Sequence, residues 1–290
     1  MLRDKIGNAS CIKSATYYDL KILNNSKSNY IITKSITLEP NNPEELNKLV
    51  DNRVVLDKNE RYPKLFYEYI KGDSFNNCGL RNYGYNYYKD LKFNKPYIIS
   101  ISDTLENIEK ILRDGEDRDN IDGYEINLEC PNVEGDNNLD LNDEKDIYKI
   151  LKVLSVSQKP FGIKIPSYEF IRYRKLIIIL GRVNKFIKFS WITCCNTYPY
   201  NNNGIRCGIG GKFLKVKVKE CIRYYKYLLN EENLDIDVIA CGGITEARDV
   251  IEYSKVGADG YQMATGLIEE GPEIFSKIKK ELKTFIYSKL

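Results

Sequence analysis

The sequence predicts an α/β fold and, within that class, a (β/α)₈ TIM barrel made of a single domain over residues 1–290. Short apolar runs alternate along the chain with stretches of helical periodicity, a pattern typical of parallel strands joined by right-handed crossovers. Eight such runs within 290 residues fit the barrel. A doubly wound open sheet is the alternative, but no Gly-x-Gly-x-x-Gly motif follows the first run.

The eight predicted strands are short and rich in Ile, Tyr and Phe. The first leads to Asn8-Ala9-Ser10, and the others cover residues 30–34, 97–102, 123–128, 161–165, 186–193, 237–240 and 260–263. Between them, apolar residues three and four positions apart predict helices at residues 104–112, 145–153, 215–229, 246–253 and 272–286. The segment 39–90 lacks clear periodicity, and we expect it to form a long loop excursion over the C-terminal mouth of the barrel.

The charge balance and the absence of long apolar stretches indicate the class of partner. Lys and Arg number 44 against 41 Asp and Glu, and the basic residues are spread along the chain, which argues against a nucleic-acid partner. No apolar stretch reaches the length of about 18 residues that a membrane span needs. The first residues carry charge where a secretion signal has apolar side chains. We therefore expect a cytoplasmic protein, without a membrane partner, that binds a small molecule.

Cysteine and histidine usage limits the chemistry. The eight cysteines include no Cys-x-x-Cys pair and no zinc-like spacing, and histidine is absent, so a metal site has little support. The absence of histidine also excludes Ser-His-Asp and Cys-His catalysis. Proton transfer must therefore depend on Cys, Lys, Asp, Glu or Tyr.

The run Tyr-Glu-Ile-Asn-Leu-Glu-Cys-Pro-Asn at residues 124–132 places a cysteine where an apolar strand stops. Side chains alternate along a strand, so Glu125, Asn127 and Glu129 are expected on one face. The proline directly after Cys130 ends the strand ladder. A lone cysteine is more often a small buried apolar residue, but at the mouth of a barrel its thiol can act as an acid, base or nucleophile.

In a (β/α)₈ barrel the ligand site is built at the C-terminal ends of the strands. Polar and small residues of this chain fall there: Lys34, Asn127, Cys130, Lys164, Asn196, Thr197, Cys241, Gly242, Gly243, Ala264, Thr265 and Gly266. The most unusual are the lysines, because a charged amine inside a barrel is costly without an anionic partner. For Lys164 the structural alternative is a pair with a carboxylate such as Glu125.

Glycine-rich turns follow the seventh and eighth predicted strands, and each turn opens a helix. Free backbone N–H groups and helix N-termini can hold a phosphate there, and Gly208-Ile209-Gly210-Gly211 could add a third set. A single Gly-Gly pair is most often only a tight turn. Two lysines, a phosphate site and a cysteine together suggest a flavin nucleotide, because a nearby cation stabilises the reduced anionic ring.

Eight motifs run in order through nearly the whole chain. They are Asn8-Ala9-Ser10, Ile32-Thr33-Lys34-Ser35-Ile36-Thr37-Leu38-Glu39, Asn76 with Gly79-Leu80, Asn127-Leu128-Glu129-Cys130-Pro131-Asn132-Val133, Gly162-Ile163-Lys164, Gly208-Ile209-Gly210-Gly211, Cys241-Gly242-Gly243-Ile244 and Glu270-Gly271-Pro272-Glu273-Ile274-Phe275. Each motif is only moderately specific, whereas the ordered set is highly specific. The set resembles the soluble, fumarate-type class 1A dihydroorotate dehydrogenases, and the cysteine distinguishes this class from membrane-associated relatives that have a serine base.

The resemblance implies an FMN enzyme of pyrimidine biosynthesis that oxidises (S)-dihydroorotate to orotate. Cys130 would remove the proton from C5 while a hydride leaves C6 for the flavin, and Lys34 and Lys164 complete the catalytic set. Fumarate as electron acceptor and a homodimer are also implied. The implied substrate-binding residues are Lys34, Asn76, Gly79, Leu80, Asn127, Asn132, Asn196 and Thr197. The implied FMN-binding residues are Ala9, Ser10, Lys34, Ser35, Asn127, Lys164, Gly211, Gly242, Gly243, Ala264 and Thr265.

Several positions depart from the family pattern. Cys11 replaces a glycine, Cys78 belongs to an Asn-Cys pair in place of a Ser-Met type pair, and Thr197 replaces a serine that begins a small-residue turn. Ala264 replaces a glycine of the phosphate site. Glu129 replaces a small residue directly before the base. A carboxylate there would raise the thiol pKa and repel the substrate carboxylate, unless it points away or pairs with a lysine.

Three hypotheses remain open at this point. The favoured one is an active class 1A dihydroorotate dehydrogenase. The second is a flavin oxidoreductase of the same fold with an altered substrate, because Cys78 and Glu129 change the surroundings of the site. The third is a non-catalytic flavin-binding paralogue that keeps the fold without turnover.

Overall fold

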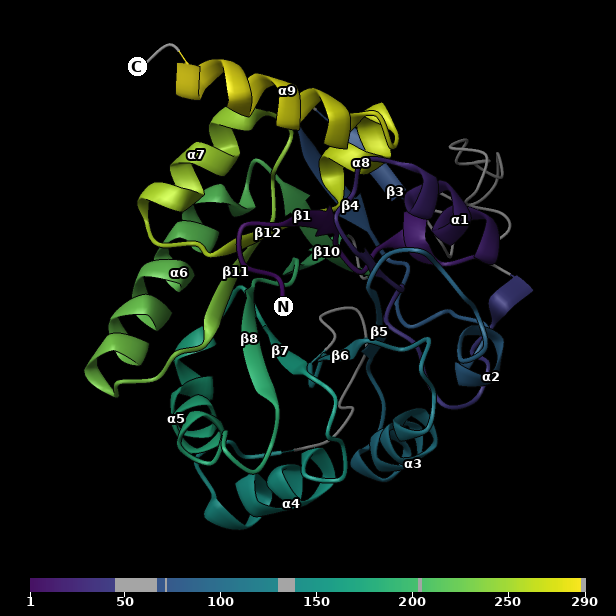
Figure 1. Cartoon of the computed structure of the whole chain (residues 1–290), viewed down its shortest axis with the longest axis vertical. Coiled ribbons are helices and arrows are strands. Elements are labelled where there is room, and N and C mark those ends of the chain that lie inside the picture. The colour runs from purple at the N-terminus through teal and green to yellow at the C-terminus, as the bar shows by residue number, and fades with distance from the viewer. Residues whose placement is uncertain (45–66, 71, 130–138, 203–204, 288–290) are drawn as a thin grey trace.

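The computed structural model describes residues 1–44, 67–70, 72–129, 139–202 and 205–287, and it has the predicted (β/α)₈ barrel at its centre. Parallel strands form one eight-stranded sheet, and helices surround it (Figure 1). In the order in which they pair, the strands are β1 (Ile6–Asn8), β12 (Gly260–Met263), β11 (Asp237–Cys241), β8 (Phe189–Cys194), β7 (Phe161–Ile165), β6 (Gly123–Ile126), β5 (Tyr97–Ile101) and β2 (Ile31–Ile32).

The α-helices of the described residues include all five that the periodicity predicted. They are α1 (Tyr17–Asn25), α2 (Tyr85–Tyr88), α3 (Leu105–Glu116), α4 (Glu144–Leu154), α5 (Arg174–Arg182), α6 (Leu214–Glu231), α7 (Ala247–Lys255), α8 (Thr265–Glu270) and α9 (Ile274–Tyr287). Thr16, Thr104 and Asp143 accept hydrogen bonds from first-turn N–H groups of α1, α3 and α4, which fixes where these helices begin. Within the described ranges, no helix has both the length and the apolar character needed to cross a bilayer.

The two ends of the barrel sheet, β1 and β2, meet through a side chain. Asn8 Oδ1 accepts the backbone N–H of Ile32 (3.0 Å), and Asn8 Nδ2 donates to the Ile32 carbonyl (2.6 Å). On the same seam, Asn29 Oδ1 accepts the N–H of Ile6 (3.1 Å). Asn8 is fully buried, so its amide satisfies backbone groups of β2 that water cannot reach.

Replacing Asn8 with alanine should therefore destabilise the protein by about 2 to 4 kcal/mol, because it leaves two buried backbone groups of Ile32 unpaired. Urea unfolding, followed by tryptophan fluorescence, measures the loss. Asn29→Ala is the matched control on the same seam. Asn29 is exposed, so water can replace its single hydrogen bond, and we expect a loss of about 1 kcal/mol or less. Equal losses for the two variants would contradict this account of the seam.

The barrel interior changes from apolar to polar toward the cavity mouth. Its apolar part consists of the buried residues Leu2, Tyr30, Ile32, Ile98, Trp191 and Ile239. Gly162 makes room for Trp191, since an added Cβ would lie 2.1 Å from the indole Nε1. Nearer the mouth, the buried Glu125 carboxylate accepts hydrogen bonds from Thr193 Oγ1 (2.8 Å) and Gln262 Nε2 (2.6 Å). This polar layer forms the floor on which the functional site rests.

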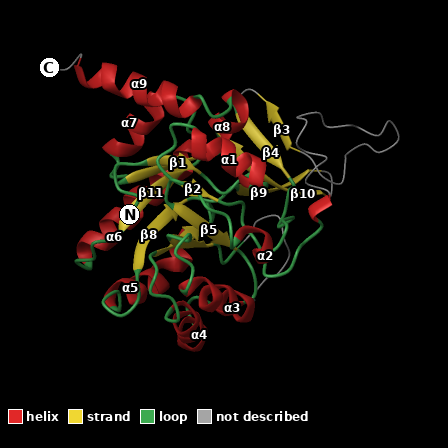
Figure 2. Cartoon of the chain, turned by 45° about the vertical axis from the view of Figure 1, so that its right-hand side comes forward, coloured by secondary structure: helices red, strands yellow, loops and turns green. Residues whose placement is uncertain are grey.

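The excursion predicted at residues 39–90 contains regular structure that its weak periodicity did not predict. Its described part includes a hairpin of β3 (Tyr67–Ile70) and β4 (Asp73–Asn76). Strand β4 pairs antiparallel with β10 (Ile205–Gly211), and β10 pairs with β9 (Tyr198–Asn202), so the four strands form a second sheet. Figure 2 shows these strands to one side of the barrel strands, with the N-terminus on the other side. This second sheet supplies one wall of the cavity described next.

Candidate functional site

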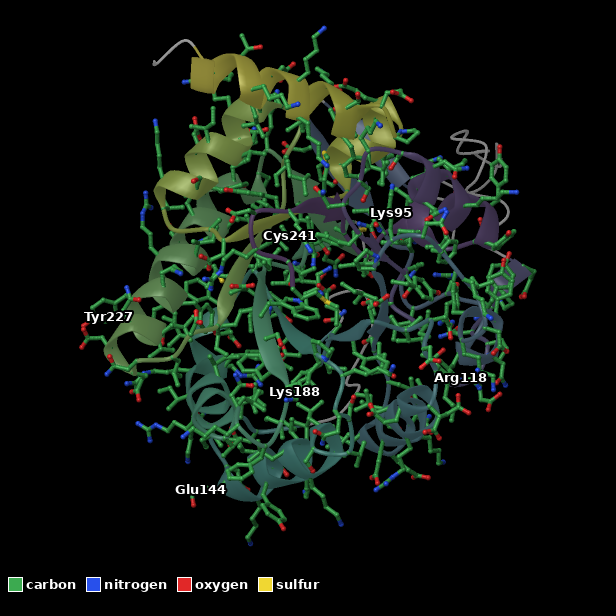
Figure 3. The ribbon with its side chains drawn as sticks, viewed as in Figure 1. Lys95, Arg118, Glu144, Lys188, Tyr227 and Cys241 are labelled. Atoms are coloured by element: carbon green, nitrogen blue, oxygen red, sulfur yellow. The ribbon has the colours of Figure 1, made fainter. Side chains whose placement is uncertain are left out.

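A cavity opens at the C-terminal ends of the barrel strands, and it encloses about 920 Å³ of empty space including its open mouth. The described residues among the implied substrate- and FMN-binding residues all line it: Ala9, Ser10, Lys34, Ser35, Asn76, Gly79, Leu80, Asn127, Lys164, Asn196, Thr197, Gly211, Gly242, Gly243, Ala264 and Thr265. Gly266, which the strand-end rule also selected, does not line it. Cys130 and Asn132 lie outside the described residues. In Figure 3, Cys241 at the end of β11 lies near the centre of the molecule, whereas Glu144 and Tyr227 lie at its outer edge. The structure thus brings the predicted residues together, and their individual roles remain predictions.

Two glycine segments approach each other closely beside the cavity. A Cβ added to Gly243, whose φ is +67°, would lie 2.4 Å from the carbonyl oxygen of Gly211. One added to Gly211, whose φ is +80°, would lie 2.3 Å from the carbonyl oxygen of Gly72. Both positions therefore require glycine. In the part of the chain that the structure describes, no acceptor receives the backbone N–H of Gly243, so this donor can bind an anion.

The segment Gly208–Gly211 corrects one expectation. It is not a third glycine turn of the kind that follows β11 and β12, because it lies in β10 and pairs residue by residue with β4. Gly210 and Gly211 nevertheless reach the cavity from the end of this strand. The register places Ser74 opposite Gly210, and Ser74 Oγ lies 3.5 Å from Thr265 Oγ1. Hydroxyl groups therefore join the glycine N–H groups on this side of the cavity.

Lys164 enters the barrel interior from β7 and is only 5% exposed. Among the described residues no hydrogen bond or ion pair reaches its ammonium group, so the alternative pairing with Glu125 does not form. Burial lowers the pKa of Lys164, but the nearby groups of Cys241 and Glu125, with smaller effects from other thiols, raise it by more. The ammonium group therefore stays charged at neutral pH. A buried charge without a partner is costly, which indicates that a ligand supplies the missing partner.

Asn196 links two parts of the site. Its Nδ2 donates to Asn127 Oδ1 (3.2 Å) and to the carbonyl of Glu129 (3.2 Å). Across the cavity, Lys34 Nζ donates to the carbonyl of Gly79 (2.7 Å), which connects the end of β2 to the excursion. Amide and ammonium groups of this kind suit a ligand that offers both donors and acceptors.

Four cysteines line the cavity: Cys11, Cys78, Cys195 and Cys241. Burial raises the pKa of Cys11 to about 12 and that of Cys241 to about 11. Burial also raises the pKa of Cys195 well above its ordinary value. These three thiols are therefore protonated at neutral pH and contribute packing rather than a base. Within the described residues, no cluster of three or more Cys, Asp or Glu side chains is arranged to hold a metal ion.

Strand alternation predicted that Glu129 would share a face with Glu125 and Asn127, and this prediction is wrong. Strand β6 ends at Ile126, so the alternation does not continue to residue 129. The Glu129 carboxylate lies 3.3 Å from Arg172 Nη1, and Glu129 does not line the cavity, whereas Asn127 does. The charge beside position 130 therefore points away from the site and pairs with an arginine.

Some cavity residues were missed by the sequence reasoning: Ile12, Ser74, Cys195, Leu214 and Ile268. Leu214 and Ile268 lie in the first turns of α6 and α8, directly after segments that were predicted for the site, so helix starts are a signal that could have found them. Ser74 and Gly210 meet only through the pairing of β4 with β10. No local sequence pattern predicts that pairing.

A cavity at the C-terminal ends of the strands of a (β/α)₈ barrel is the usual place of an enzyme site for a small molecule. The family model for dihydroorotate dehydrogenase matches residues 1–286. The chain therefore belongs to the dihydroorotate dehydrogenase family, which is flavin-dependent.

Curated relatives agree with this assignment, and solved structures share the fold. The putative dihydroorotate dehydrogenase A (fumarate) of Streptococcus agalactiae is 30% identical over 97% of this chain and 89% of its own. Dihydroorotate dehydrogenase A (fumarate) of Lactococcus lactis is 30% identical over 97% of this chain and 90% of its own. Crystal structures of the Eimeria tenella enzyme share the fold. The ferulenol complex has a TM-score of 0.71 at 16% identity and covers 98% of this chain and 82% of its own. The ligand-free form has a TM-score of 0.69 at 18% identity and covers 98% and 84%.

Proposed function

We propose that this chain oxidises (S)-dihydroorotate to orotate, with FMN as its cofactor and fumarate as its electron acceptor. The observation that carries the proposal is the family match over residues 1–286. The gathering of Lys34, Asn127 and Lys164 around one cavity supports it. The fumarate-type names of the relatives support the choice of acceptor.

The cavity residues fit a flavin nucleotide. Among the described residues, the unpaired N–H group of Gly243 suits a phosphate, and the unpaired ammonium of Lys164 suits an electron-rich ring. Gly211, Gly242, Gly243, Ala264 and Thr265 would hold the phosphate. Ala9, Ser10, Lys34, Ser35, Asn127 and Lys164 would contact the rest of the cofactor. Bound there, FMN would accept the hydride that leaves C6 of the substrate.

Proton removal and substrate binding are carried out by side chains of the protein. As the resemblance implies, Cys130 takes the proton from C5 as a thiolate; the absence of histidine and the raised pKa values of Cys11, Cys195 and Cys241 are consistent with this role. Asn76, Asn127, Asn132 and Asn196, together with Gly79, Leu80 and Thr197, hold the pyrimidine. Lys34 holds the substrate edge, where its ammonium already reaches the Gly79 carbonyl. Lys164 supplies the positive charge that favours the reduced state of the site.

The assembly belongs to the same proposal. We propose a single FMN-binding domain over residues 1–290 that works in the cytoplasm as a homodimer, as the resemblance to the soluble class implies. Size-exclusion chromatography with light scattering on the FMN-loaded protein reports the oligomeric state directly.

Anaerobic flavin reduction tests the proposed function. The purified protein should be yellow, its visible flavin absorbance should bleach on addition of dihydroorotate, and the colour should return with fumarate. Bleaching by dithionite but not by dihydroorotate would favour an altered substrate, for which the departures at Cys78 and Glu129 would be the first places to look. A colourless protein that takes up no FMN would contradict the proposal and favour the non-catalytic alternative.

A further inference from the structure

Glu129 and Arg172 form an ion pair directly beside the proposed active site. Glu129 Oε1 lies 3.3 Å from Arg172 Nη1, and the side chains are 24% and 36% exposed. In the sequence Glu129 immediately precedes Cys130, the proposed base. Arg172 belongs to the short 3-10 helix Phe170–Tyr173 that follows β7, the strand of Lys164.

The backbone and the side chain of Glu129 are held by different partners. Its carbonyl accepts a hydrogen bond from Asn196 Nδ2 (3.2 Å), and the same amide also donates to Asn127 Oδ1 (3.2 Å). Asn127 and Asn196 line the cavity, whereas Glu129 does not. The main chain at residue 129 is therefore fixed to the wall of the site while its carboxylate is turned toward Arg172.

Arg172 contacts more than one carboxylate. Its Nη1 also lies 3.4 Å from Glu169 Oε2, and its Nη2 donates to the carbonyl of Leu139 (3.5 Å). Glu129 and Leu139 lie before and after residues 130–138 in the sequence. A single guanidinium thus contacts the described residues on both sides of that segment, an arrangement for which the fixed fork of arginine is suited.

The charges around Glu129 decide what its carboxylate does to a neighbouring thiol. Burial raises the pKa of Glu129 and Glu169 adds to this shift, whereas Arg172 and, to a smaller extent, the Tyr173 hydroxyl oppose it. With Arg172 present, the negative charge of Glu129 is compensated locally. Without it, an ionised Glu129 would disfavour the thiolate at position 130, because like charges at short range raise the pKa of an acid.

We propose that Arg172 is a positioning residue that holds the Glu129 carboxylate away from the cavity and neutralises it, which allows Cys130 to act as a base at neutral pH. The inference rests on the proposed function, because it assumes that Cys130 is the base. It also explains how this chain tolerates a carboxylate at a position where the family it resembles has a small residue.

The test measures the thiol itself, independently of turnover. The pH dependence of Cys130 alkylation by iodoacetamide, quantified by mass spectrometry of the peptide that contains it, gives the Cys130 pKa in the FMN-loaded protein. Arg172→Gln should raise this pKa by about half a unit to one unit, the size expected for an uncompensated charge one residue away. The rising limb of the pH profile for flavin reduction should shift in the same direction.

Charge rescue separates an electrostatic role from a structural one. Adding Glu129→Gln to Arg172→Gln removes the uncompensated charge, so the double variant should regain the original Cys130 pKa. Arg172→Lys keeps the positive charge and should shift the pKa less than Arg172→Gln. Arg174→Gln is the matched control, because Arg174 is exposed two residues further on, at the start of α5, and its substitution removes the same charge from the surface.

Two outcomes would overturn the inference. One is an unchanged Cys130 pKa in Arg172→Gln. The other is a raised pKa that Glu129→Gln fails to restore, which would assign Arg172 a purely structural role through Leu139. A failure of the proposed function is distinguishable, because it would show as turnover that persists without the Cys130 thiol, whatever the alkylation pKa.

Discussion

Cys130→Ala protein should bind FMN and yet be reduced by dihydroorotate at least about a hundredfold, and up to about ten-thousandfold, more slowly than the parent, the range typical for loss of a general base. The chain contains no histidine that could take over the proton. Three of the four described cavity thiols, Cys11, Cys195 and Cys241, stay protonated because burial raises their pKa values. Stopped-flow measurement of anaerobic flavin bleaching gives the rate.

Two further variants make this result specific. Cys130→Ser keeps a hydroxyl in place of the thiol and should retain part of the rate, since a serine is the base in the membrane-associated relatives. Cys221→Ala removes a thiol that is buried on α6 and does not line the cavity, so the flavin should still be reduced at close to the parental rate. Undiminished flavin reduction in Cys130→Ala would remove Cys130 from the mechanism.

Lys164→Gln should lower the two-electron reduction potential of the bound flavin by about 30 to 60 mV, which corresponds to about 1.4 to 2.8 kcal/mol. The reason is that the Lys164 ammonium is buried, charged and unpaired among the described residues, so its charge is free to stabilise an electron-rich reduced ring. Photoreduction against a redox dye of known potential measures the change.

Linkage provides an independent check on the Lys164 prediction. A drop of about 30 mV requires reduced FMN to bind about tenfold more weakly relative to oxidised FMN, and this ratio can be measured by separate binding titrations. Lys188→Gln is the control, because Lys188 is an exposed lysine just before β8 and its loss removes the same formal charge. An unchanged potential in Lys164→Gln, or an equal change in Lys188→Gln, would show that Lys164 does not act on the flavin.

The sequence predicted the barrel strands because their apolar runs are bounded by clear breaks. The strands expected at residues 161–165 and 260–263 have the predicted bounds. Helix α5 was missed because Leu176, Ile177, Ile178, Ile179 and Leu180 are consecutive apolar residues, which hides a helical period. The strand expected from residue 186 begins at Phe189, and Phe186 is 77% exposed. An aromatic residue there extended the pattern without belonging to the core.

The site was predictable where it follows the ends of barrel strands, and unpredictable where it depends on distant pairing. Lys34, Asn127 and Lys164 fall at positions that the barrel rule selects. Ser74 reaches the cavity because β4 pairs with β10 more than a hundred residues further along the chain, and no local spacing encodes that contact. The direction of the Glu129 side chain could not be predicted either, because it depends on where β6 ends and on Arg172 from the 3-10 helix after β7.

The pairing of β4 with β10 also sets a distance. Asp73 lies opposite Gly211 beside the glycine turns, and Asn76 lies opposite Gly208 at the other end of the ladder. Strands rise about 3.3 Å per residue, so these ends are roughly 10 Å apart. The pairing of the two strands therefore sets the distance between the phosphate-binding and substrate-binding ends of the proposed site. Deleting one residue from either strand would shorten this distance and turn the side chains beyond the deletion to the opposite face of the sheet. Changes in the length of the two strands should therefore be tolerated less well than substitutions within them.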